Sequence, residues 1–209
     1  MTKGAPVNTQ RWQRLMADIH IPAELETYAA LEAAYSERYR YYHTVRHIDH
    51  CLAEFDLASN LAIEPAEVEI ALWFHDAIYK PHAFNNEEAS ADWAERFLRR
   101  HSVEPSRIAR IRAHILATRH ASPATSSDSQ LVVDVDLAIL GTDEDTYREF
   151  EVNVRKEYEW VPGPIFRRKR AEILQSFLDR PCIYNTELFR DRYEAAARSN
   201  LVAAIAALH

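Results

Sequence analysis

The scarcity of glycine constrains the fold of this 209-residue chain more than any other feature. The chain has only three glycines, Gly4, Gly141 and Gly163, and no two of them are close in sequence. Glycine-rich phosphate loops and dinucleotide-binding turns need several glycines within a few residues, so the sequence excludes both. Long alanine-containing stretches without glycine favour helices instead. We therefore expect an all-α protein.

Helical periodicity, capping residues and prolines predict where the individual helices lie. The predicted helices cover residues 9–19, 23–39, 44–60, 65–79, 85 or 86 to 101, 106–119, 143–160, 165–178 and 186–208. A polar loop is expected at residues 120–129 and a sharp break at residues 161–164.

Residues 131–137 conflict with this pattern, because they alternate with a period of two and contain several β-branched residues. These properties favour a strand. No second strand candidate is available to pair with it, and a lone strand is not stable. We therefore interpret this segment as a buried helix.

Length and composition are those of one domain. With 47% hydrophobic residues, the chain can bury a substantial core. We expect a single helical bundle over residues 1–209, with a core at residues 40–141 and C-terminal helices at residues 143–208. The net charge of −7 disfavours binding to nucleic acid or to an anionic membrane.

Two cysteines far apart, Cys51 and Cys182, are typical of a reducing compartment. The chain shows no leader pattern and no apolar run of the ~20 residues that a membrane span needs. We therefore expect a cytoplasmic protein. The helix-rich termini could pack against a second copy of the chain to form a homodimer.

Histidines and aspartates suggest a metal site. On a helix, His43, His47 and His50 would fall within about 60° of one another, beside the apolar face. A surface helix with solvated histidines is the alternative.

A second group of candidate ligands lies in residues 66–79, where His75 falls on the apolar stripe and Asp76 follows it. A packed core histidine is the simpler interpretation of His75 alone. Since a carboxylate at the edge of a buried face needs a cation or donors, the pair favours a metal site.

A third candidate ligand comes from Asp134 and Asp136, which interrupt a later apolar run. They would diverge by about 200° on a helix, so only one can face the site. We favour Asp136, with Asp134 as the alternative.

The histidine, His-Asp pair and aspartate, in this order on predicted helices, resemble the HD superfamily of metal-dependent phosphohydrolases. The resemblance implies a helical HD-type fold and a metal bound by His47, His75, Asp76 and Asp136. Two nitrogen and two oxygen ligands suit a divalent Mn, Fe, Co, Ni or Mg ion, which would polarise a phosphoryl oxygen and activate water. We expect no thiolate in reach of the motif, and hence no closed structural zinc site.

Further stretches are similar to a bacterial subgroup of predicted HD phosphohydrolases, and the likeness extends over most of residues 40–200. They are residues 86–91, 117–120, 136–141, 155–158 and 197–200. Nucleotidase and stringent-response members of the superfamily carry acidic residues within a turn after the His-Asp pair. This chain has Tyr79 and Lys80 there, so neither specific activity is transferred.

Roles in catalysis follow from the same resemblance. Residues 43–47 resemble the His-Asn-x-x-His element of cyclic-nucleotide phosphodiesterases, with Thr44 in place of the asparagine, which implies that His43 is a general acid. Glu87 or Glu88 could orient water, or could simply complement a helix dipole. We expect Asp76 to be needed for both metal binding and activity.

Four cationic side chains could bind phosphate: Arg46, Lys80, Arg119 and His120. His114 and His120 could instead help to hold a second metal. We expect a phosphohydrolase acting on a small phosphomonoester or phosphodiester, with nucleotides as the substrate class. The alternatives are an HD-fold oxygenase with two irons and a non-catalytic sensor that binds a nucleotide.

Overall fold

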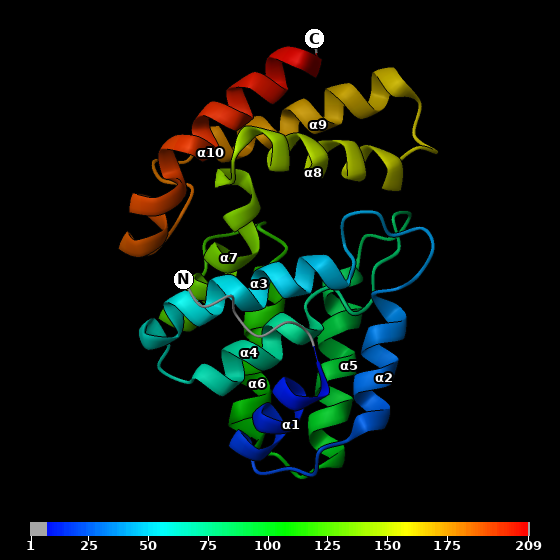
Figure 1. Cartoon of the computed structure of the whole chain (residues 1–209), viewed down its shortest axis with the longest axis vertical. Coiled ribbons are helices and arrows are strands. Elements are labelled where there is room, and N and C mark those ends of the chain that lie inside the picture. Colours follow the sequence, from blue (N-terminus) through cyan, green and yellow to red (C-terminus); the bar gives the residue numbers. More distant parts are fainter. Residues whose placement is uncertain (1–7, 209) are drawn as a thin grey trace. The chain divides into compact units, whose positions relative to one another are not determined.

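A computed structural model of the chain describes residues 8–208. These residues form ten α-helices and two 3-10 helices without any β-strand, which confirms the all-α prediction (Figure 1). The α-helices are α1 (Thr9–Asp18), α2 (Leu25–Ala34), α3 (Val45–Ala58), α4 (Pro65–Phe74), α5 (Asn86–Arg100), α6 (Pro105–Ala117), α7 (Ser127–Asp136), α8 (Glu144–Glu157), α9 (Gly163–Leu178) and α10 (Glu187–Leu208). The 3-10 helices are η1 (Ser59–Leu61) and η2 (Leu137–Gly141).

The chain divides into two compact units, and the boundary falls between Asp136 and Leu137. The first unit contains α1 to α7, and the second contains η2 and α8 to α10. The interpretation as one domain stays a prediction.

Helix α4 is the centre of the first unit, where it contacts α1, α3, α5, α6 and α7. It is buried almost all round, as a central core helix must be, and its apolar residues are Val68, Ile70, Ala71, Leu72, Trp73 and Phe74. It carries two carboxylates, Glu67 and Glu69. Glu67 is fully buried and accepts hydrogen bonds from Arg107 and Arg110 of α6 at 2.7–2.9 Å, which compensates the carboxylate.

Residues 131–136 are helical, as predicted, because they belong to α7. Several predicted boundaries are wrong. The second helix ends at Ala34 rather than at residue 39, and the fourth ends at Phe74 rather than at residue 79. Helix α7 begins at Ser127, inside the expected loop, where the Ser126 hydroxyl accepts a hydrogen bond from Ser129 N. Helix α8 ends at Glu157 rather than at residue 160.

The second unit is built around η2, which packs against both α8 and α10. All five residues of η2 are buried. Asn200 of α10 donates hydrogen bonds to the carbonyls of Leu140 and Thr142, both at 2.9 Å. Gly141 lies directly against Tyr193, where a Cβ would come within 2.5 Å of the Tyr193 Cβ. Close approach of η2 to α10 therefore requires glycine at this position.

Candidate metal centre

Four predicted ligands from three separated segments meet inside the first unit. His47 Nε2 lies 3.0 Å from His75 Nε2. Oδ2 of Asp76 lies 3.1 Å from His75 Nε2 and 3.5 Å from His47 Nε2. On the other side, Oδ1 of Asp136 lies 3.4 Å from His47 Nε2 and 3.6 Å from His75 Nε2.

These separations are those of ligands that share one ion. Neighbouring ligand atoms at bonds of about 2.1 Å are about 3.0 Å apart in octahedral and 3.4 Å apart in tetrahedral geometry. Both histidines are almost completely buried, and 15% of each carboxylate side chain is exposed. Two imidazole nitrogens and two carboxylates thus face one point at the edge of the core.

The end of α4 explains how the His-Asp pair reaches this point. Tyr35 donates its hydroxyl hydrogen to the carbonyl of Trp73, at 3.0 Å. The Arg40 guanidinium donates to the carbonyls of Asp76 and Ala77, at 2.7 and 3.0 Å. Because these side chains occupy carbonyls that a longer helix would use, α4 stops at Phe74 and the chain turns at the pair.

Arg40 also connects this turn to the segment before α3. Its guanidinium donates a hydrogen bond to the carbonyl of His43 at 3.2 Å and pairs with Glu37 at 3.0 Å. The Arg40 side chain is fully buried and lies over the rings of Tyr35 and Tyr79. A single side chain therefore holds two of the segments that carry predicted site residues.

Hydrogen bonds orient two of the predicted ligands. His75 Nδ1 lies 2.9 Å from the carbonyl oxygen of Leu72, so Nδ1 carries a proton and Nε2 points to the other ligands. Asp136 uses its two oxygens differently. Its Oδ1 faces the histidine pair, and its Oδ2 lies 3.0 Å from His120 Nε2. This arrangement, a metal-binding group held by an outer partner, is typical of metal sites.

Charge compensation in the cluster is strong. Burial alone would lower the pKa of His75, but the charge of Asp76 and hydrogen bonds with Asp136 and Asp76 hold that pKa well above its usual value. Burial alone would raise the pKa of Asp136, yet hydrogen bonds with His120, His47 and His75 hold that pKa well below its usual value. The two largely buried carboxylates thus require positive charge, which either imidazolium groups or a divalent cation can supply.

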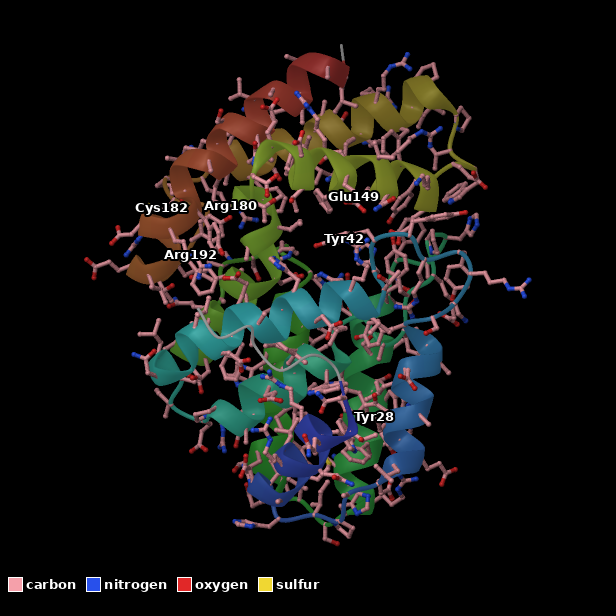
Figure 2. The ribbon with its side chains drawn as sticks, in the orientation of Figure 1. Tyr28, Tyr42, Glu149, Arg180, Cys182 and Arg192 are labelled. Atoms are coloured by element: carbon pink, nitrogen blue, oxygen red, sulfur yellow. The ribbon has the colours of Figure 1, made fainter. Side chains whose placement is uncertain are left out.

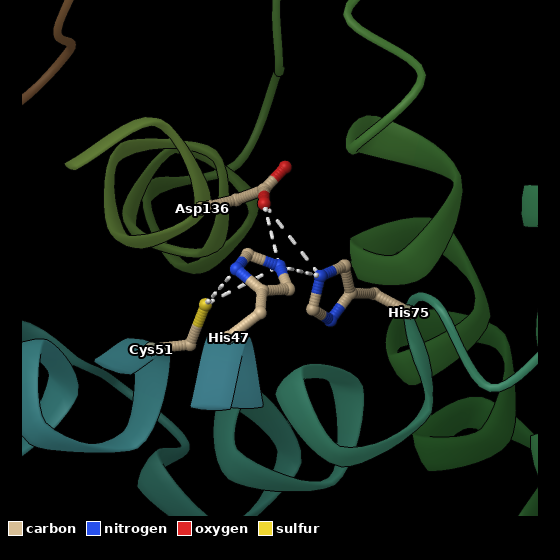
Figure 3. A group of neighbouring side chains, drawn as sticks. All are labelled: His47, Cys51, His75 and Asp136. Carbon is tan, nitrogen blue, oxygen red and sulfur yellow. Dashed lines mark hydrogen bonds and ion pairs between the residues drawn. The ribbon is translucent and has the colours of Figure 1, made fainter. Parts of the chain in front are cut away.

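A thiol lies in the same cluster, so the expectation of no thiolate in reach is wrong. Cys51 Sγ lies 3.7 Å from Nε2 and 3.8 Å from Nδ1 of His47 (Figure 3). Ligand atoms of His47, Cys51, His75 and Asp136 all lie within 4.8 Å of one another. This buried group could hold a metal ion.

His43 borders the cluster outside the helix. Helix α3 begins at Val45, so His43 lies in the preceding loop with Tyr42, whose position Figure 2 shows. His43 Nε2 is 4.0 Å from Asp76 Oδ2, and its ring stacks on Tyr79 with centroids 4.1 Å apart. The His43 side chain is 20% exposed. It is therefore a fixed imidazole at the border between the cluster and solvent.

The described contacts of the other residues predicted to bind phosphate or orient water include none of the four predicted ligands. Arg119 pairs with Glu88, whereas Glu87 is half-buried in the first turn of α5. Lys80 and Arg46 are both exposed.

Two other candidate ligands lie apart from these contacts. His114 is buried and bonded through Nδ1 to Ser129 Oγ at 2.8 Å, and the described contacts of His114 include none of the four predicted ligands. Of the two candidate aspartates, Asp136 contacts His47 and His75, and Asp134 is fully buried.

Sequence reasoning missed three residues that shape the cluster. Cys51 follows His47 by one helical turn, and this spacing was a usable signal. Arg40 and Tyr79 carry no such signal, because their contacts join segments far apart in the chain.

Comparisons of the chain with models of known protein families, with curated proteins and with solved structures found no match. The helical fold and the His/Cys/His/Asp cluster are compatible with an HD-like fold. Among residues 8–208, no helix combines the length and the apolar character that crossing a membrane requires.

Proposed function

We propose that this protein is a metal-dependent phosphohydrolase of the HD type, acting on a small phosphomonoester or phosphodiester. One observation carries the proposal. The Nε2 atoms of His47 in α3 and His75 at the end of α4 lie 3.0 Å apart, and one carboxylate oxygen each of Asp76 and Asp136 lies 3.1–3.6 Å from both nitrogens. Nucleotides are proposed as the substrate class because of the resemblance of the sequence motif to HD phosphohydrolases.

The donor set fits a divalent cation such as Mn²⁺, Fe²⁺, Co²⁺, Ni²⁺ or Mg²⁺. His47, His75, Asp76 and Asp136 would hold it, and His120 would fix the orientation of Asp136 through its second carboxylate oxygen. When bound, such an ion supplies Lewis-acid polarisation of a phosphoryl oxygen and activation of water. Four protein ligands leave room for both on a six-coordinate ion.

Other side chains serve proton transfer and binding in this proposal. His43 would protonate the leaving oxygen, since its Nε2 lies near the ligand Asp76 and its ring is fixed by stacking on Tyr79. Lys80 would bind the phosphate, because it is exposed four residues after Asp76 and its backbone is fixed by the Asn86 amide. Arg119 already pairs with Glu88, so binding to phosphate would require it to exchange partners.

The remaining predicted roles depend on position alone. Arg46 is exposed at the start of α3, close in sequence to His47, and would add positive charge at the entrance. Glu87 is half-buried at the start of α5 and would orient water for attack.

Phosphate release tests the proposal. The intact protein would be assayed against nucleotides, cyclic nucleotides and sugar phosphates with added Mn²⁺, Co²⁺ or Mg²⁺. Asp76→Asn removes one ligand charge, and Asp18→Asn, at an exposed position in α1, is the matched control. We expect metal-dependent turnover that Asp76→Asn abolishes and Asp18→Asn retains. Equal turnover in both variants would refute the mechanism, and absence of turnover in metal-loaded protein would favour the oxygenase or the sensor.

A further inference from the structure

Cys51 is the one potential ligand in the cluster that the proposed phosphohydrolase mechanism does not use. It lies on α3 one turn after His47, so both side chains project from the same face of that helix. The thiol is fully buried, and its sulfur is within 4.8 Å of ligand atoms of His47, His75 and Asp136. A buried cysteine often serves only as a small apolar side chain, so its distances from the other groups decide whether it can be a ligand.

The distances suit coordination. A nitrogen bonded at about 2.1 Å and a thiolate bonded at about 2.3 Å to one tetrahedral ion lie about 3.6 Å apart. Cys51 Sγ and His47 Nε2 are 3.7 Å apart. In a six-coordinate site a nitrogen and a sulfur on opposite sides of the ion are about 4.4 Å apart, so ligand atoms up to 4.8 Å apart need only a small side-chain movement to bind the same ion.

Two possible sets of ligands therefore share one histidine pair and Asp136. Asp76 completes the set with a hard carboxylate oxygen, whereas Cys51 completes it with a soft sulfur. Hard ions such as Mg²⁺ prefer oxygen ligands, and thiolates favour Zn²⁺ and similar borderline ions. The identity of the ion thus depends on whether the sulfur binds.

We propose that the Cys51 thiolate is a metal ligand that makes this site select Zn²⁺, Co²⁺ or Fe²⁺ over Mg²⁺. The inference rests on the proposed metal centre and extends it from a ligand set to a class of ion. On binding, the thiol proton passes to solvent and the sulfur lone pair forms the bond to the ion, with no change of oxidation state.

Absorption spectroscopy with Co²⁺ distinguishes the metal centre from its sulfur ligand. The metal-stripped, reduced, intact protein would be titrated with Co²⁺. Visible d–d bands report that Co²⁺ is bound, and a near-ultraviolet sulfur-to-cobalt charge-transfer band reports a thiolate ligand. Cys51→Ser removes the thiol with little change in volume. Cys182→Ser is the matched control, because Cys182 is exposed and lies between α9 and α10 (Figure 2).

We expect both kinds of band in the wild type and in Cys182→Ser. Cys51→Ser should keep the d–d bands, lose the charge-transfer band and bind Co²⁺ at least about tenfold more weakly, with Mg²⁺ affinity unchanged. Visible bands without charge transfer in the wild type would overturn the role of Cys51 and leave the metal centre standing. Absence of all bands in the wild type would overturn the metal centre itself. The wild-type spectrum decides between these outcomes even if Cys51→Ser does not fold.

Discussion

Removing the Arg40 guanidinium should destabilise the first unit and weaken its metal site together. The side chain is fully buried and donates to three carbonyls, those of His43, Asp76 and Ala77. The Arg40–Ala77 bond is wholly buried, so Arg40→Met leaves that carbonyl unsatisfied at a cost of about 1–3 kcal/mol. The other two carbonyls can bind water, and each lost bond costs about 1 kcal/mol net.

These contributions sum to about 3–5 kcal/mol for Arg40→Met. With a urea m-value of about 2 kcal/mol/M, the unfolding midpoint should fall by about 1.5–2.5 M. Tryptophan fluorescence is a suitable probe, because Trp12 and Trp73 are buried in the first unit and Trp160→Phe removes the half-exposed tryptophan of the second. Arg38→Met, at an exposed position two residues earlier, is the matched control.

The same variant should bind Co²⁺ at least about tenfold more weakly, because Arg40 holds the backbone of two site segments. The stability and Co²⁺ affinity of Arg40→Lys should lie between those of the wild type and Arg40→Met, because an ammonium cannot reach all three carbonyls at once. The reasoning is refuted if Arg40→Met and Arg38→Met unfold at the same urea concentration and bind Co²⁺ equally well.

Three further predictions follow from the packing and the charges. Gly141→Ala should lower the free energy of unfolding by about 1–3 kcal/mol, because its Cβ would lie 2.5 Å from a side-chain carbon of α10. Gly163→Ala, the matched control, should leave stability unchanged or raise it. Urea unfolding measures both variants, and equal midpoints would contradict the packing. Burial lowers the pKa of His114, so the unfolded chain binds the additional proton, and the stability contributed by the neutral ring is complete above about pH 6.5 and lost as the pH falls. His114→Gln should therefore flatten the decline of stability below that pH, and an unchanged slope of the urea midpoint against pH would disprove this. Asp136→Asn should weaken metal binding at least about tenfold in calorimetric titrations while Asp134→Asn leaves it unchanged, and the opposite order would exchange the two aspartates as ligands.

The sequence predicts the helices well and their ends poorly. Periodicity and scarce glycine lead to ten helices in residues 8–208, including α7, where the absence of a pairing strand outweighs the local β-propensity. The end of α4 depends on Tyr35 and Arg40, which bind the carbonyl of Trp73 and that of Asp76 in the following turn from more than 30 residues away. Local patterns contain no trace of such contacts, so the prediction extended that helix by five residues.

For the candidate site, sequence spacing goes further than for the helix ends. Helical geometry requires that Asp134 and Asp136 face different directions, and the structure brings Asp136 to the histidines. Cys51 stands one helical turn from His47, and that spacing, rather than the number of cysteines, is the sequence signal of its place in the cluster. The bond between His120 and Asp136 joins the segment after α6 to the end of α7 and depends on tertiary packing.

Anomalous X-ray diffraction from crystals of the protein grown with Co²⁺ tests the central claim most directly. The account predicts one cobalt peak per chain, within about 2.0–2.4 Å of His47 Nε2, His75 Nε2 and Asp136 Oδ1, with Asp76, Cys51 or both completing the shell. Cobalt bound only elsewhere, or no peak in crystals where these five side chains keep their positions, would contradict a metal centre at this cluster.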